Sequence, residues 1–223
     1  MKTVAIIPAR GGSKGIPRKN IKDFCGKPLI SYIITTALNT PNLDRVIVST
    51  EDQEIAEISK KYGAEIPFLR PIELARDETP TLPVLKHAIQ YLEEEENYFP
   101  DVIALLYPTS PLLGPKKIEE AIDLMKTGLD SVVSVNESRG HYWIKDGGYQ
   151  RLYPKNIQNR QYTKPIFKEN GAIYLAKKDL IIKQNLLVGG NLQLFMMKKE
   201  ESIDIDTAFD FEMAEYMMKK RMK

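Results

Sequence analysis

Residues 3–20 read TVAIIPARGGSKGIPRKN, an apolar run that breaks directly into a loop rich in glycine and in cations. Residues 4–7 are apolar and uncharged, which predicts a buried strand, and Pro8 has no N–H to continue a ladder. The loop therefore begins at the carboxyl end of a strand, the edge of an α/β sheet where ligands bind. We expect a phosphate cradle, with positive φ at Gly11, Gly12 and Gly15 turning N–H groups toward an anion. The surrounding cations are Arg10, Lys14, Arg18 and Lys19.

Two well-known phosphate loops do not fit this stretch. It has no G-x-x-x-x-G-K-[ST], and its glycines do not follow G-x-G-x-x-G with an acid about 20 residues later. These absences disfavour a P-loop ATPase and a dinucleotide dehydrogenase. The alternative is a solvated basic surface loop, as most loops are.

Beyond the loop, strand-like and helix-like segments alternate along the chain. Apolar runs predict strands at 46–48, 102–106, 132–135, 172–175 and 192–195. Helical spacing appears at 29–38, 54–61, 84–94 and 118–125. The connections are long enough for crossovers, so we expect an α/β fold with a doubly wound, mostly parallel sheet.

The composition fits one domain spanning residues 1–223, with 43% apolar residues and a net charge of +2. Apart from the first loop and the tail at 219–223 the basic residues are dispersed, which disfavours nucleic acid as a partner. The tail cations fit a helix C-terminus.

One cysteine, Cys25, excludes internal disulfides and zinc clusters. No apolar run reaches membrane-spanning length or resembles a signal peptide, so we expect no membrane partner and a cytoplasmic location.

A second chemical pattern is SIDIDT at residues 202–207. In an extended segment Asp204 and Asp206 share one face, while Ile203 and Ile205 pack on the other. Adjacent carboxylates repel, and Mg²⁺ bound by two carboxylates and substrate phosphates would relieve that repulsion. The alternative is a solvent-facing acidic edge, because Thr207 and Asp210 also have the spacing of a capping box.

Five ordered blocks resemble the cytidylyltransferases that activate nine-carbon sugar acids, the CMP-N-acylneuraminate synthetase family. They are IIPARGGSKGIPRKN at 6–20, STEDQEIAEISKKYGAEIPFLRPIELARD at 49–77, LLYPTSPL at 105–112, ENGAIYLA at 169–176 and ESIDIDTAFDFEMAE at 201–215. The resemblance implies a nucleotide-diphospho-sugar transferase-like fold and a reaction of CTP with a nonulosonic acid that releases pyrophosphate. It also implies that the polar, aromatic segment at about 136–167 is an inserted lobe that forms a homodimer and reaches the partner's active site. Exposed aromatics suit such an interface, although Trp143 could instead belong to a small core.

The resemblance suggests roles for individual residues. Lys19 would contact the α-phosphate and, with Arg10 and Asp206, carry the catalysis, while Asp204 and Asp206 would hold Mg²⁺. Two binding sites are also implied. The CTP site would comprise Arg10, Gly11, Ser13, Lys14, Lys19, Asn20, Arg70 and Thr81. The sugar-acid site would comprise Tyr107, Thr109, Ser110, Arg160, Lys168 and Asn170. Arg160 and Lys168 are the candidates for binding the sugar carboxylate, and either could do so across the dimer interface.

Residue by residue, several of these positions also have ordinary explanations. Arg70 could bridge a surface carboxylate, turn chemistry accounts for Thr109 and Ser110, and His87 and His141 are expected to be structural.

Three positions depart from the sialic-acid pattern: Tyr107 replaces a glutamine, while Leu113 and Lys168 replace arginines. Because such polar pairing selects among close analogues, N-acetylneuraminate, legionaminate and pseudaminate all remain candidates. Two other functions stay open, an enzyme for the eight-carbon 3-deoxy-octulosonate and a non-catalytic nucleotide-binding module.

Overall fold

The computed structural model describes residues 1–156 and 159–222. The strands are β1 (Thr3–Pro8), β2 (Asp23–Phe24), β3 (Lys27–Pro28), β4 (Arg45–Ser49), β5 (Val102–Leu105), β6 (Ser131–Ser138), β7 (Trp143–Lys145), β8 (Tyr149–Arg151), β9 (Ile166–Lys177) and β10 (Leu192–Met196). The α-helices are α1 (Leu29–Leu38), α2 (Gln53–Lys61), α3 (Thr81–Glu94), α4 (Pro115–Met125), α5 (Lys178–Gln184) and α6 (Ala208–Arg221). Short 3₁₀ turns are η1 (Lys19–Ile21), η2 (Ile72–Ala75), η3 (Arg160–Tyr162) and η4 (Lys199–Glu201).

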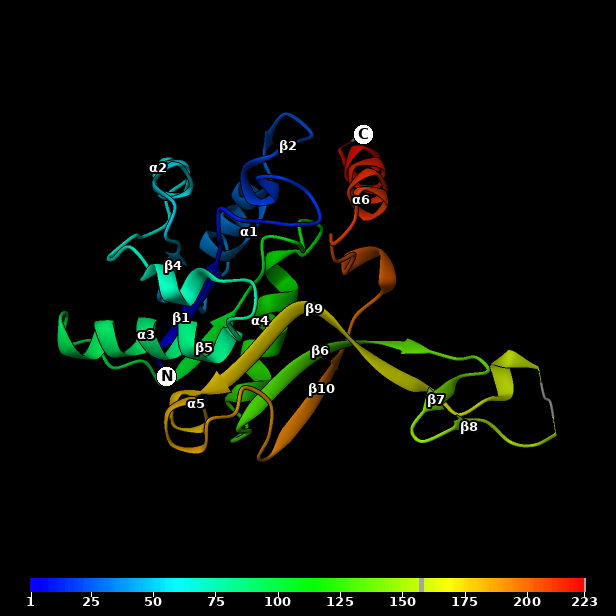
Figure 1. Cartoon of the computed structure of the whole chain (residues 1–223). Helices are drawn as coiled ribbons and strands as arrows, with labels where there is room; N and C mark the ends of the chain where they lie inside the picture. The colour runs from blue at the N-terminus through cyan, green and yellow to red at the C-terminus, as the bar shows by residue number, and fades with distance from the viewer. Residues whose placement is uncertain (157–158, 223) are drawn as a thin grey trace.

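The central sheet has the strand order β10-β6-β9-β5-β1-β4 (Figure 1). β1 runs parallel to β4 and β5, and β10 runs parallel to β6, whereas β9 is antiparallel to both of its neighbours. Each strand-like run of the sequence lies in or overlaps one of these strands, which confirms the expected mostly parallel α/β fold. The predicted helices are confirmed as α1, α2, α3 and α4.

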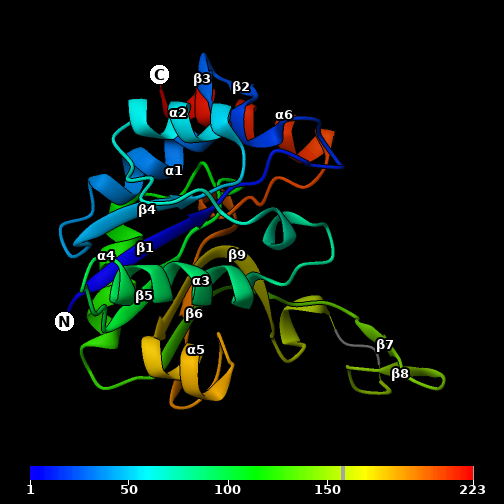
Figure 2. The ribbon, with the colours of Figure 1, turned by 60° about the vertical axis from the view of Figure 1, so that its left-hand side comes forward.

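Helices cover both faces of the sheet. Ala5 and Ile7 of β1 pack in one apolar cluster with residues of α1, α2 and α4, and Val4 and Ile6 pack in another with residues of α3 and α5. Because both faces of β1 are covered, all of its inner residues are apolar. Figure 2 shows α3 and α5 together on one side of the sheet. No helix in the described part of the chain is long and apolar enough to cross a membrane.

A third apolar cluster joins the first loop to the C-terminal helix. It contains Ile16, Phe24, Leu29, Ile205, Phe211 and Ala214. Phe24 meets Phe211 edge to face, with ring centroids 5.4 Å apart. This cluster holds α6 beside β2 and β3 (Figure 2) and anchors the acidic segment through Ile205, which is fully buried. The last turn of α6 carries Lys219, Lys220 and Arg221, as expected for tail cations at a helix C-terminus, while Lys223 lies outside the described residues.

The segment between β6 and β9 forms an arm, here residues 139–156 and 159–165. The β7–β8 hairpin of this arm projects from the body of the molecule (Figure 1). Trp143 is 51% exposed and packs against Arg151 and Tyr153, so it does not belong to a buried core. Residues 157 and 158 of the expected inserted lobe lie outside the described residues.

Candidate active site

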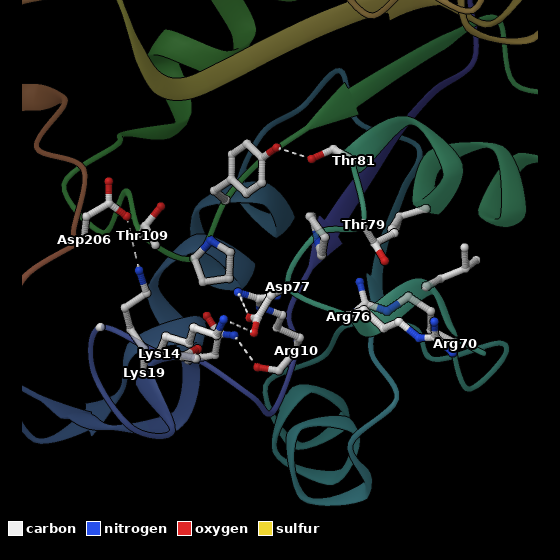
Figure 3. Close-up of a pocket in the computed structure, with 18 residues that line it drawn as sticks. Arg10, Lys14, Lys19, Arg70, Arg76, Asp77, Thr79, Thr81, Thr109 and Asp206 are labelled. Atoms are coloured by element: carbon white, nitrogen blue, oxygen red, sulfur yellow. Dashed lines mark hydrogen bonds and ion pairs between the residues drawn. The ribbon is translucent and has the colours of Figure 1, made fainter. Parts of the chain in front are cut away.

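Two cavities lie side by side where the first loop meets the acidic segment, and Asp206 borders both of them. The first has a volume of about 400 Å³ and is drawn in Figure 3, and the second has a volume of about 430 Å³. The charged residues of the first cavity are Arg10, Lys14, Lys19, Arg70, Arg76, Asp77 and Asp206. The charged residues of the second are Lys168, Lys199, Glu169, Asp204, Asp206 and Asp210. Cations thus dominate one cavity and carboxylates the other.

Lys19 links the first loop to the acidic segment. Its Nζ donates to the carbonyl oxygen of Ile205 at 2.5 Å and lies 3.5 Å from Oδ1 of Asp206 (Figure 3). Its side chain is largely buried, with 14% of its surface exposed. The ammonium group therefore stands at the boundary between the two cavities.

Asp77 pairs with two other cations of the loop, Arg10 and Lys14, whereas Arg18 pairs with Asp52 and Glu54. The Asp77 carboxylate lies 2.8 Å from Arg10 and 2.6 Å from Lys14 (Figure 3). Lys14, and secondarily Arg10, lower the pKa of Asp77 below its ordinary value. A phosphate entering this cavity would replace the carboxylate as partner of the two cations.

The glycines of the loop act differently from our expectation. Gly11, Gly12 and Gly15 lie outside the left-handed region, and the positive φ of this loop falls on Arg18, at 54°. At Gly15 the reason for glycine is space, because an added Cβ would lie 2.6 Å from the carbonyl oxygen of Asp206. The prediction of positive φ is therefore wrong, and close approach of backbone to backbone is the feature that requires Gly15.

The nucleotide-site residues from the sequence largely come together. Arg10, Ser13, Lys14, Lys19, Asn20, Arg70 and Thr81 all border the first cavity. Asn20 is 6% exposed and its Nδ2 donates to the carbonyl oxygen of Arg10 at 2.9 Å, which braces the loop from within. Gly11 does not border either cavity, and its N–H donates to Glu51 at 2.7 Å.

The sugar-site residues divide between several places. Lys168 and Asn170 border the second cavity, whereas Tyr107 and Thr109 border the first. Ser110 is 1% exposed and, like Arg160 on the arm, borders neither cavity.

Tyr107 is held from two sides. Its hydroxyl forms a 2.8 Å hydrogen bond with Thr81 (Figure 3). Its ring meets Tyr174 edge to face. Burial raises the pKa of Tyr107, so its phenol stays neutral at physiological pH.

Asn170 owes its position to an irregularity of the sheet. The β6–β9 register shifts between Val133 and Val135, and Gly171 has a φ of 72°. The Oδ1 of Asn170 accepts from the Ser134 hydroxyl at 2.6 Å and from the Ala172 N–H at 3.1 Å. Its Nδ2 is buried and has no hydrogen-bond partner among the described residues. An amide donor bordering the second cavity is thus left for a ligand.

The acidic segment follows the expected alternation without being a strand. Ile205 is buried, Asp204 is half-buried and Asp206 is exposed, and both carboxylates border the second cavity. Burial raises the pKa of Asp204 and the Asp206 charge adds to the shift, against a hydrogen bond from Thr109. The capping box of Thr207 and Asp210 is also present, and it begins α6. The capping box of the alternative interpretation is therefore confirmed, while the magnesium site stays a prediction.

Several residues bordering the site were not predicted. Arg76, Asp77 and Thr79 follow η2 and border the first cavity, and Asn136, Lys199 and Ser202 border the second. Asn136 donates to the Met197 carbonyl at 2.7 Å and to the Ser202 hydroxyl at 2.9 Å, which ties β6 to the segment leading to Asp204. Asp77 belongs to the block at residues 49–77 that resembles the family, but only the structure reveals that it pairs with Arg10 and Lys14.

A family model for cytidylyltransferases matches residues 4–222. The chain belongs to the cytidylyltransferase family. It is 34% identical to the pseudaminic acid cytidylyltransferase of Campylobacter jejuni, over 98% of this chain and 97% of that relative. It is also 34% identical to the CMP-N,N'-diacetyllegionaminic acid synthase of Legionella pneumophila, with the same two coverages. With the N-acylneuraminate cytidylyltransferase A of Danio rerio it shares 39% identity, over 95% of this chain and 49% of that relative.

Among solved structures, the cytidylyltransferase resembles CMP:2-keto-3-deoxy-manno-octonic acid synthetase complexed with CTP. The TM-score is 0.74 at 18% identity, over 99% of this chain and 100% of that one. A likeness at this identity concerns the fold. Membership of the family makes the chain a nucleotidyltransferase.

Proposed function

We propose that this cytidylyltransferase joins CTP to a nonulosonic acid, giving a CMP-sugar acid and pyrophosphate. The anomeric hydroxyl oxygen of the sugar would form a bond to the α-phosphorus of CTP. The bond from that phosphorus to the oxygen bridging to the β-phosphate would break, so pyrophosphate leaves and the hydroxyl proton is released. The observation that carries the proposal is the pair of cavities of opposite charge that share Asp206.

The first cavity suits the triphosphate. Arg10 and Lys14 would exchange Asp77 for phosphate oxygens, and the buried Lys19 would face the α-phosphate at the boundary of the cavities. Fixed cations stabilise the charge that develops in the transition state without reorganising at the moment of reaction. Thr81 and Arg70, on the far side of the cavity, would hold the nucleoside.

Asp204 and Asp206 fit a magnesium site. They are two carboxylates bordering one cavity, beside the cavity proposed for phosphate, and Mg²⁺ typically takes one or two carboxylates together with substrate phosphates. A set of three acidic, histidine or cysteine ligands is not found among the described residues, so phosphate and water oxygens would complete the coordination. When bound, Mg²⁺ would neutralise phosphate charge and lower the pKa of the attacking hydroxyl.

The second cavity suits a polar sugar acid. The buried Nδ2 of Asn170 needs an acceptor, and a hydroxyl, acyl or carboxylate oxygen of the sugar would provide one. Lys168 on β9 would attract the sugar carboxylate as a point charge, without the two parallel hydrogen bonds of an arginine. The relatives carry names for pseudaminic, legionaminic and N-acylneuraminic acids, so the choice among these acids stays open.

A homodimer would complete the site. Arg160 lies on the arm and borders neither cavity of its own chain, which leaves it for the partner's sugar carboxylate. The arm exposes large apolar side chains, among them Trp143 at 51%, Tyr149 at 74% and Tyr162 at 67%. Such aromatics are enriched at protein interfaces. The cytoplasmic location stays a prediction from the sequence.

The direct test is pyrophosphate release from CTP, ATP, GTP or UTP with Mg²⁺ and one sugar acid at a time. The acids are N-acetylneuraminate, legionaminate, pseudaminate and 3-deoxy-octulosonate. We expect release only with CTP and strongest with one of the nine-carbon acids. If release is strongest with the eight-carbon acid, the substrate is not a nonulosonic acid. If protein that binds CTP releases no pyrophosphate with any of the acids, a non-catalytic binding module is favoured.

The metal assignment has its own test in Asp206→Asn. We expect turnover to fall most at limiting Mg²⁺ and to recover in part as Mg²⁺ is raised, because one carboxylate of the site is lost. Undiminished turnover at limiting Mg²⁺ would refute the assignment.

A further inference from the structure

Glu51 is a charged residue beside the first cavity that has no role in the proposed chemistry. It comes just after Thr50, the residue that follows β4, at the carboxyl edge of the sheet, and its side chain is 12% exposed. One carboxylate oxygen, Oε1, accepts from the Gly11 N–H at 2.7 Å, and the other, Oε2, accepts from Nη2 of Arg70 at 2.7 Å. A single carboxylate thus joins the phosphate loop to the arginine of the nucleotide cavity.

Arg70 depends on this contact more than an ordinary surface arginine would. Its side chain is 4% exposed, and its Nε is buried with no hydrogen-bond partner among the described residues. The Arg70 N–H donates to the carbonyl of Thr50, the residue before Glu51, at 2.8 Å, which ties the backbone of Arg70 next to Glu51. A buried guanidinium without a paired carboxylate is strongly disfavoured, and its side chain would turn toward another anion or toward water.

We propose that Glu51 is a positioning residue for nucleotide binding. Its Oε1 holds the loop at Gly11, and its Oε2 fixes the Arg70 guanidinium at the nucleoside end of the first cavity. The inference rests on the proposed function, since it takes CTP as the occupant of that cavity. Glu51 itself does not touch the ligand in this role, because it does not border the first cavity.

The charge of the pair indicates what Arg70 recognises. Glu51 neutralises Arg70 and is 12% exposed, so a triphosphate would not readily displace it. Arg10, Lys14 and Lys19 lie together at the other end of the cavity (Figure 3), and Asp77, the partner of Arg10 and Lys14, is 35% exposed. The unpartnered Nε of Arg70 instead suits a neutral acceptor, such as a ribose oxygen or a pyrimidine carbonyl. Glu51 thereby lets a buried cation act as an oriented hydrogen-bond donor.

Two substitutions separate the two contacts of Glu51. In Glu51→Gln the amide oxygen can still accept from Gly11, but the charged bond to Arg70 is lost. We expect KM and Kd for CTP to rise about tenfold or more, with kcat within about twofold of the wild type, because a ground-state contact is removed. In Glu51→Ala both contacts are lost, so kcat should fall as well. Glu57→Gln is the matched control, since Glu57 is an exposed residue of α2 and, within the described part of the chain, accepts only from Gln53.

Coupling to Arg70 distinguishes positioning from a general loss of stability. Arg70→Gln should weaken CTP binding, and adding Glu51→Gln to it should cost no further affinity, because the second residue acts through the first. Titration calorimetry with CTP and Mg²⁺, in the absence of any sugar acid, measures these affinities without turnover. Melting temperatures of all variants are recorded in the same buffer.

The outcomes separate this inference from the proposed function. Wild-type protein that binds no CTP would refute the proposed function. Wild-type binding with unchanged binding by Glu51→Gln would refute only the role of Glu51, as would additive losses in the double variant. If Glu51→Ala does not fold, Glu51→Gln and the double variant still decide the question.

Discussion

We expect Gly15→Ala to lower the activity of this enzyme far more than its stability. Gly15 borders the first cavity, and a Cβ built on it would lie 2.6 Å from the backbone carbonyl oxygen of Asp206. Ordinary contacts begin at 3.4 Å, so the loop and the acidic segment would have to separate by about 0.8 Å. No flexible side chain can absorb this shift, because the opposing atom is backbone.

The separation acts on Lys19 and Asp206 together. Lys19 reaches the Ile205 carbonyl at 2.5 Å and Asp206 at 3.5 Å from the same loop that carries Gly15. A misplacement of about 1 Å in a catalytic constellation can cost roughly 100-fold in rate, so we expect kcat to fall between roughly tenfold and 100-fold. Overpacking costs about 1 kcal/mol at the low end, which in a chain of this length lowers Tm by about 2–4 °C.

Gly12→Ala is the control within the same loop. A Cβ on Gly12 would have nothing within 4 Å, and neither glycine has a left-handed φ. Steady-state kinetics with CTP and the preferred sugar acid, together with thermal melts, compare both variants with the wild type. Equal kcat values for the two variants would refute the reasoning, because they would show that the close approach to Asp206 has no bearing on catalysis.

Three further variants test other contacts of the site and the core. Asp77→Asn removes the carboxylate that pairs with Arg10 and Lys14, so CTP should bind severalfold more tightly at low salt, and weaker binding in titration calorimetry would contradict this. Asn170→Asp keeps the oxygen that accepts from Ser134 and Ala172 but loses the unpartnered amide donor. We expect KM for the sugar acid to rise about tenfold while the affinity for CTP stays unchanged. An unchanged KM for the sugar acid would contradict this role of Asn170. Burial, and secondarily the charge of Arg70, lower the pKa of His87 below its ordinary 6.5. The unfolded chain therefore binds a proton at His87 more tightly than the folded chain does. Stability should fall as pH drops through and below 6.5. His87→Gln should flatten the fall in Tm between about pH 7 and pH 5, and an identical slope in the variant would contradict this assignment.

Elements with strong patterns were predictable from the sequence. The apolar run before Pro8 predicted β1 because both of its faces are covered, and helical spacing predicted α1 at residues 29–38. Short elements gave no such signal: α5 has seven residues, and the β2 and β3 strands have two each. Their formation depends on packing against the rest of the chain rather than on local periodicity.

The site shows the same division. Residue types and their order in the sequence indicated a cation-rich loop, an acidic pair and a nucleotide-transferring family, because phosphate and Mg²⁺ require those groups. Only the tertiary structure decided which groups meet: Asp77 in the cradle, Glu51 between Gly11 and Arg70, and Asp206 against Gly15. These pairs are separated by 19 to 191 residues along the chain, and no local spacing encodes a contact made by folding several strand ends onto one edge of a sheet.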